Sequence, residues 1–167
     1  LTKRQGPESA SHNYPTSDYS WGVYAVRPRR SLTTSVTARG LPLDLYVQPR
    51  TESCTYLSAV VPLASAQRVV VRVASAGAFR VRWDGSDVAT DAQFHRSMLF
   101  ERSVVAIDAA AGDHLLTLKV CSAARPDNGR VRVVLTDDKG GPIEVDTSSD
   151  PTRLQAVWQR TRGSHVT

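Results

Sequence analysis

Three aspartates form the densest group of carboxylates in the sequence: Asp84, Asp87 and Asp91. Hard cations such as calcium bind several carboxylate and carbonyl oxygens at once, so this group is a candidate cation or ligand-binding site. The spacing does not match an established calcium-binding loop, and aspartates are also common as solvated turn residues. We take these three residues as the candidate binding site and a structural calcium ion as the one cofactor considered. Solvated turn acids are the favoured alternative.

Patterns that would indicate catalysis are missing from the sequence. It contains no Gly-x-Ser-x-Gly elbow, phosphate-binding loop or His-Glu-x-x-His motif. The histidines at 12, 95, 114 and 165 lack the spacing of metal ligands, and His114 is expected to flank a strand. Glu101 and Arg102 fall within a predicted strand, where cross-strand pairing accounts for them. Because no nucleophile with a base, and no catalytic pair of carboxylates, can be assembled, we expect a protein that is not an enzyme.

The two cysteines, Cys54 and Cys121, each stand at the edge of a predicted strand. In an oxidising compartment they could form a disulfide that closes a loop of 67 positions (121 minus 54). A bridge of that span contributes roughly 4 kcal/mol if it is unstrained. In a reducing compartment the same residues would be two buried thiols, and the sequence leaves both alternatives open.

The elements that would position these residues are β-strands, and they are clearest between residues 68 and 121. Apolar residues alternate with arginines over residues 79–83, so the apolar side chains can face a core while Arg80 and Arg82 face water. The Asp84-Gly85 pair that follows has the composition of a hairpin turn. A second inward row is predicted at Leu116, Leu118 and Val120, with Leu115, Thr117, Lys119 and Cys121 on the opposite face.

The same alternation, bounded by turn residues, recurs along the chain at regular spacing. It predicts strands at 21–26, 32–38, 43–47, 56–61 (ending at Pro62), 68–74, 79–83, 98–107, 114–121, 130–136 and 143–145, with a loop around 87–93. Short strands of this kind at regular spacing predict an all-β fold, an antiparallel two-sheet sandwich (jelly roll).

The two ends of the chain differ from this sandwich module, which is assigned to residues 21–147. Residues 1–20 are polar and predict a tail or linker, and residues 148–167 predict a linker and the start of a helix. Asp150 can cap this helix, and Pro151 fits its first position. Its apolar stripe either packs on the sandwich or begins the next domain of a longer chain, and we favour the second. The stripe consists of Leu154, Val157 and Trp158.

Four segments of the sandwich carry a resemblance to a known family. They are Tyr-Leu-Ser-Ala at 56–59, Phe-Arg-Val-Arg-Trp-Asp-Gly at 79–85, Gly-Asp-His-Leu-Leu-Thr-Leu-Lys-Val at 112–120 and Leu-Thr-Asp-Asp-Lys-Gly-Gly-Pro at 135–142. Over residues 43–145 the chain resembles the galactose-binding-like jelly rolls, and the related protective-antigen-type sandwiches, of large bacterial envelope and secreted proteins. The resemblance implies a jelly roll outside the cytoplasm, beside peptidase or tetratricopeptide domains. Some such modules bind sugars and often hold calcium, but their binding loops have no match here.

Charge and hydropathy argue against specific nucleic-acid binding and against a membrane-spanning segment. The net charge of +5 comes from scattered basic residues rather than a basic stripe with exposed aromatics, so no specific nucleic acid is expected. No apolar run approaches the roughly 20 residues of a membrane span, so no transmembrane segment is expected. The sequence therefore predicts a non-catalytic module that binds or presents a glycan, a peptide or a neighbouring domain. The alternative is a structural spacer before a helical repeat array.

Overall fold

The computed structural model describes residues 40–43, 51–125, 127–143, 145–148 and 150–163. The predicted tail at 1–20 and the predicted strands at 21–26 and 32–38 lie outside the described residues, as does all of 43–47 except Leu43. The description of the sandwich therefore begins at Gly40.

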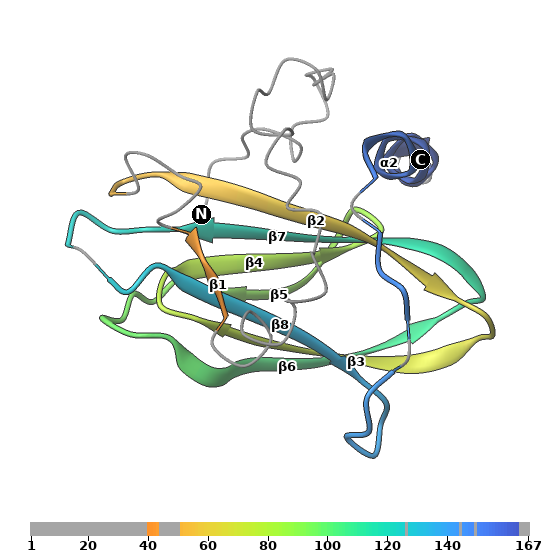
Figure 1. Cartoon of the computed structure of the whole chain (residues 1–167), viewed down its shortest axis with the longest axis horizontal. Coiled ribbons are helices and arrows are strands. Elements are labelled where there is room, and N and C mark those ends of the chain that lie inside the picture. The colour runs from red at the N-terminus through yellow and green to blue at the C-terminus, as the bar shows by residue number, and fades with distance from the viewer. Residues whose placement is uncertain (1–39, 44–50, 126, 144, 149, 164–167) are drawn as a thin grey trace.

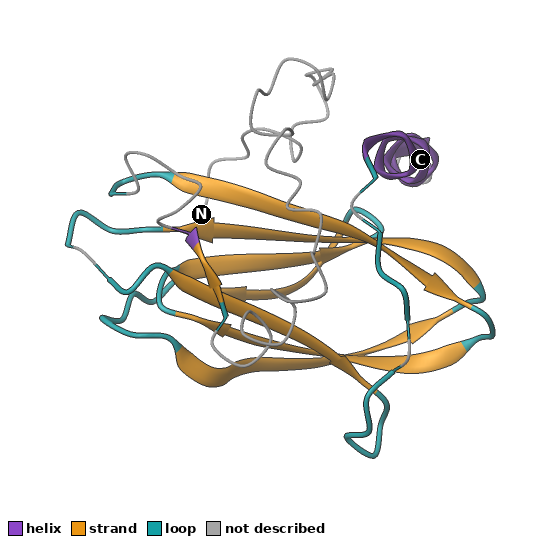
Figure 2. Cartoon of the chain, in the orientation of Figure 1, coloured by secondary structure: helices purple, strands orange, loops and turns teal. Residues whose placement is uncertain are grey.

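The described residues form eight strands and one helix (Figure 1, Figure 2). The elements are β1 (Leu41–Pro42), β2 (Cys54–Leu63), β3 (Gln67–Ser75), β4 (Ala78–Trp83), β5 (Ser86–Asp91), β6 (Leu99–Ala109), β7 (Gly112–Cys121), β8 (Arg130–Thr136) and α2 (Pro151–Gly163). Every predicted strand between residues 56 and 136 is present, with its ends shifted by a few residues.

The strands make two four-stranded antiparallel sheets, in the orders β1-β8-β3-β6 and β2-β7-β4-β5. β1 pairs with β8, β2 with β7, β3 with β6 and β4 with β5. This nested pairing is that of one long hairpin rolled into two layers, which is the jelly-roll arrangement. The predicted all-β, two-sheet jelly roll with a short C-terminal helix is confirmed.

A single apolar core fills the space between the two sheets. The fully buried side chains at its centre include Val71 from β3, Phe79 and Val81 from β4, and Leu118 from β7. These residues occupy the inward positions that the alternating pattern predicts, because successive side chains of a strand point to opposite faces. The core thus joins the β3-containing sheet to the β4-containing sheet.

The expectation that the arginine-bearing face of β4 is wet is wrong. The side chains of Arg80 and Arg82 are only 12% and 18% exposed, and both pair with Asp87 on β5. Lys119 of β7 is also buried, and its ammonium group lies 5.4 Å from the centre of the Tyr56 ring. Long basic side chains lie along the sheet and cover it with their aliphatic stems.

Two predicted boundaries are also wrong. The predicted loop around residues 87–93 is largely the strand β5, whose aspartates mimic loop composition but pair with arginines of neighbouring strands. β2 continues through Pro62 to Leu63, because β2 is an edge strand of its sheet and proline is tolerated where one side of a strand is unpaired. The predicted strand at 143–145 is absent at 143 and 145, and residue 144 lies outside the described residues.

The helix α2 begins where the sequence predicts it. Asp150 accepts a hydrogen bond from the backbone N–H of Arg153 at 2.9 Å, which is the expected N-terminal cap. Val157 packs against Val60 of β2 and Leu115 of β7, and α2 lies beside these two strands in Figure 1. Of the two alternatives for the apolar stripe, the described residues show packing on the sandwich.

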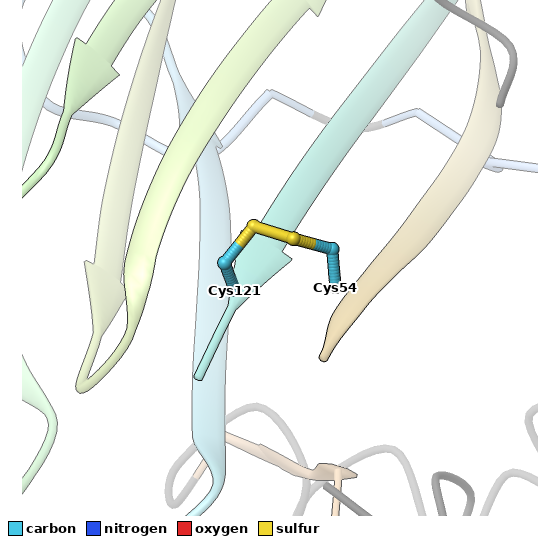
Figure 3. The surroundings of a disulfide bond; sticks show 2 residues. All are labelled: Cys54 and Cys121. Carbon is cyan, nitrogen blue, oxygen red and sulfur yellow. A yellow bond between two sulfur atoms is a disulfide. The ribbon is translucent and has the colours of Figure 1, made fainter. Parts of the chain in front are cut away.

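A disulfide joins the two cysteines, which are cross-strand partners at the start of β2 and the end of β7 (Figure 3). The sequence left open whether Cys54 and Cys121 meet. The antiparallel register places them directly opposite each other, so the bridge fastens the edge strand β2 to the centre of its sheet.

We predict that removing the disulfide lowers the free energy of unfolding by about 4 kcal/mol, because the bridge restricts the unfolded chain over a loop of 67 residues. Urea unfolding of a Cys54→Ser, Cys121→Ser double variant measures the loss. Reduced wild-type protein is the matched control and should unfold at the same urea concentration as the double variant. Equal stability of oxidised and reduced wild type would contradict the prediction.

Candidate functional site

Asp84 has a structural role in the turn between β4 and β5. Its carboxylate accepts hydrogen bonds from the backbone N–H of Leu115 at 2.7 Å and from Nδ1 of His114 at 2.6 Å. The other ring nitrogen of His114 lies 2.8 Å from the carbonyl oxygen of Ala110, and the ring stacks on Trp83. Because both nitrogens of His114 are engaged within the protein, this histidine joins two turns to β7 rather than presenting a ligand.

Asp87 and Asp91 lie on β5 and are each paired with arginine. Asp87 lies 3.0 Å from Arg82 and 3.6 Å from Arg80, both on the neighbouring strand β4. Asp91 lies 2.7 Å from Arg102 of β6 and accepts a hydrogen bond from the backbone N–H of Gln93 at 2.9 Å. Burial by itself raises the pKa of Asp91, but its hydrogen bonds to Gln93 and Arg102 outweigh that effect, and the pKa lies below its ordinary value.

The structure therefore does not bring the three predicted binding residues together. Asp87 and Asp91 are four residues apart on β5, which separates them by on the order of 13 Å. Asp84 lies in the turn that precedes β5, at the opposite end of the strand from Asp91. Within the described ranges, no group of three or more histidine, cysteine, aspartate or glutamate side chains could hold a metal ion. These acids instead balance arginines and cap the backbone.

The sequence predicts only cross-strand pairing for Arg102, and the local pattern does not reveal that its side chain points between the sheets. Its side chain is only 4% exposed and connects β6 to the other sheet through Asp91. One terminal nitrogen, Nη1, lies within hydrogen-bonding distance of three successive carbonyl oxygens in the turn between β3 and β4, those of Ser75, Ala76 and Gly77. The guanidinium also lies 5.1 Å from the centre of the Phe79 ring in the core.

This inward arginine accompanies a bulge in β6. Val73 pairs with Ser103 but Ser75 pairs with Leu99, so residues 100–102 lie opposite the single residue Ala74. Glu101 adopts a φ of 52°, which is uncommon for a residue other than glycine. The sequence signal is the order Leu-Phe-Glu-Arg at 99–102, which breaks the alternation of apolar and polar residues.

The bulge forms one wall of an open groove on the outer face of the β1-β8-β3-β6 sheet, with a cavity volume of about 540 Å³. Phe100 stands at this wall with 64% of its surface exposed. Arg72 pairs with Glu101 at 2.9 Å and donates from Nε to the Thr136 hydroxyl at 3.3 Å. The lining comes from the middle strands β3 and β8, from the β6 bulge and from Gly140 of the following turn.

Arg132 also lines this groove, and it has no counter-charge among the residues that the structure describes. It lies on β8 as the cross-strand partner of Ala74. Within the described part of the chain its side chain makes no hydrogen bond or ion pair, and its Nε is buried without an acceptor. A buried N–H group without an acceptor costs free energy, about 1–3 kcal/mol, so the position is suited to a ligand that brings oxygen atoms and draws the guanidinium toward it.

A second, smaller cavity of about 280 Å³ lies between α2 and two turns of the sandwich, the one between β4 and β5 and the one between β6 and β7. Its acidic groups are engaged: Asp84 binds His114, and Asp113 forms two hydrogen bonds with Arg153. Arg160 donates to the carbonyl oxygen of Asp113. These contacts fasten α2 to the sandwich, so the groove on the outer sheet face is the better candidate for a ligand.

The sequence matches no protein-family model, and no curated protein is similar to it. The resemblance to the galactose-binding-like family therefore stays a prediction, while the jelly-roll fold that it implies is observed. Among the described residues, no helix has the length and apolar character needed to cross a membrane.

We predict that Arg102→Gln lowers the free energy of unfolding by about 3 kcal/mol, because it leaves Asp91 without its cation and a turn without a donor. The matched control is Arg68→Gln, which breaks an exposed ion pair with Asp108 and should have a much smaller effect, because exposed ion pairs contribute little to stability. A double-mutant cycle with Asp91→Asn isolates the coupling. Equal effects of the Arg102 and Arg68 substitutions in urea unfolding would contradict the structural role.

We also predict a change of stability with pH at Asp91. A carboxyl group whose folded pKa is lowered stabilises the fold above its unfolded pKa, near 4, and loses that contribution as the pH falls through the folded pKa. The difference in unfolding free energy between wild type and Asp91→Asn should therefore shrink as the pH falls below about 4. If this difference in unfolding free energy stays constant down to about pH 2, ionisation of the Asp91 carboxyl group does not contribute to the stability of the fold.

Proposed function

We propose that this domain is a non-catalytic binding module that holds a glycan in the groove on the outer face of the β1-β8-β3-β6 sheet. The observation that carries the proposal is the Phe100 ring, which is 64% exposed at the wall of a polar groove. Exposed aromatic rings are costly in water and offer flat apolar faces to a ligand. Recognition sites combine such faces with a few polar side chains.

The position of the groove favours a ligand that is recognised through side chains. β3 pairs with both β6 and β8, and β8 pairs with both β1 and β3, so much of their backbone is engaged within the sheet. An extended peptide that binds through main-chain hydrogen bonds needs a free strand edge instead. A sugar offers a ring face to Phe100 and hydroxyl groups to Glu101 and Thr136, which line this groove.

The acidic and basic side chains elsewhere support a non-catalytic role. Asp84, Asp87 and Asp91 are each bound to a histidine or an arginine, and both nitrogens of His114 are engaged. A general base needs to reach a proton of the substrate, which these contacts oppose.

The disulfide supports placement outside the cytoplasm. Bridges such as Cys54–Cys121 form and persist in oxidising compartments. In the proposal the domain is therefore part of a larger envelope or secreted bacterial protein, as the family resemblance implies.

A second candidate function, docking of a partner strand, is favoured by the free edge of β6. Among the described strands β6 pairs only with β3, and its segment 103–107, Ser-Val-Val-Ala-Ile, has no charged residue or proline. Val104 in this segment is 50% exposed. Edge strands usually carry charges or proline that block pairing with another chain, so this edge suits an added peptide strand.

We predict that Phe100→Ala weakens glycan binding about five- to tenfold, because an aromatic stacking partner contributes on the order of 1–1.5 kcal/mol. Screening the wild-type protein on a glycan array identifies the ligand, and calorimetry then compares the variants. Phe94→Ala is the matched control, because Phe94 is 48% exposed but does not line the groove. Absence of any glycan ligand, or equal losses in the two variants, would reject the groove as a glycan site.

A further inference from the structure

We infer that the ligand of the groove is an acidic sugar, whose carboxylate binds Arg132 while a sugar ring lies on Phe100. The inference rests on the proposed function and adds the chemical class of the ligand. It comes from the charge of the groove and from the register of the three strands that form it.

The strand register places Phe100, Ala74 and Arg132 in one row across the sheet. Ala74 of β3 is the cross-strand partner of Arg132 on β8, and the bulge carrying Phe100 lies opposite Ala74 on the other side. The backbones of β6 and β8 are two strand spacings apart, on the order of 10 Å. Since alanine has a small side chain, the ring and the cation stand on either side of a low floor. A ligand lying across this row would contact both.

The charges of the groove favour an anion at Arg132. Arg72 is neutralised by Glu101 at 2.9 Å, whereas Arg132 has no ion-pair partner among the described residues. The described residues of the groove therefore carry one net positive charge, at the end of the row opposite Phe100. A guanidinium matches the two oxygens of a carboxylate, and such charge-assisted hydrogen bonds are about twice as strong as neutral ones.

The remaining polar groups suit the hydroxyls of the same sugar. The Glu101 side chain is 59% exposed while its carboxylate is held by Arg72, so it can accept hydrogen bonds from a ligand without moving. The Thr136 hydroxyl, fixed by Arg72 at 3.3 Å, lies further along the groove. An acidic peptide would also satisfy Arg132, but it would leave these hydroxyl-binding groups and the ring face without a matched partner.

Calorimetric titration of the full chain tests the inference. The probes are oligosaccharides of galacturonate, glucuronate, mannuronate and guluronate, their methyl esters, which remove the charge but keep the ring, and hexaglutamate as an acidic peptide. The variants are Arg132→Gln, which removes the cation, and Ala74→Leu, which fills the floor of the groove. Arg68→Gln is the control, because it removes a positive charge from the same sheet outside the groove. Thermal unfolding shows that each variant is folded.

We expect at least one uronate oligosaccharide to bind, and its methyl ester to bind about tenfold more weakly, as loss of a charge-assisted hydrogen bond predicts. Arg132→Gln should weaken uronate binding by a similar factor and leave the ester unaffected, Ala74→Leu should abolish both, and Arg68→Gln should change neither. Equal binding of acid and ester overturns the inference but leaves the groove as a glycan site. Binding of hexaglutamate that depends on Arg132, without any sugar binding, overturns both in favour of an acidic peptide.

Discussion

The buried guanidinium of Arg102 is the contact on which the shape of the candidate binding face depends. It belongs to an edge strand, yet it points between the sheets, where it pairs with Asp91 and reaches three carbonyl oxygens of the turn between β3 and β4. A charge can be buried there because its donors meet acceptors on both sides of the sandwich. Turning this side chain inward requires extra residues in β6, and the resulting bulge directs Phe100 and Glu101 outward.

The two sheets consequently have outer faces of different character. On the β2-β7-β4-β5 sheet, α2 packs on Val60 and Leu115, and Asp87 pairs with both arginines of β4. The outer face of the β1-β8-β3-β6 sheet instead carries an exposed ring and a cation that has no counter-charge among the described residues, on either side of a small residue. The first arrangement stabilises the domain, and the second is suited to a ligand.

The core could be predicted from the sequence, whereas the groove could not. Alternation over 79–83 follows from the geometry of an extended chain, and it identified the inward side chains of β4 correctly. The sequence predicts a loop where β5 lies, because its aspartates have loop composition and their arginine partners are elsewhere in the fold. Arg102 and the turn carbonyls that it binds are 25 or more residues apart, and the row of Phe100, Ala74 and Arg132 comes from three separate strands. Such contacts depend on strand register, which local patterns do not specify.

The location of ligand-induced changes is the most direct test of this account. Amide chemical shifts of the whole chain can be followed by NMR while a uronate oligosaccharide that binds is added. If the ligand binds in the groove, the largest shifts fall at 72–74, 100–101 and 132–136, on three strands that share one face. Shifts confined to the free edge of β6 or to the β2-β7-β4-β5 sheet would contradict this expectation, because the ligand would then bind away from the groove that the Arg102 bulge creates.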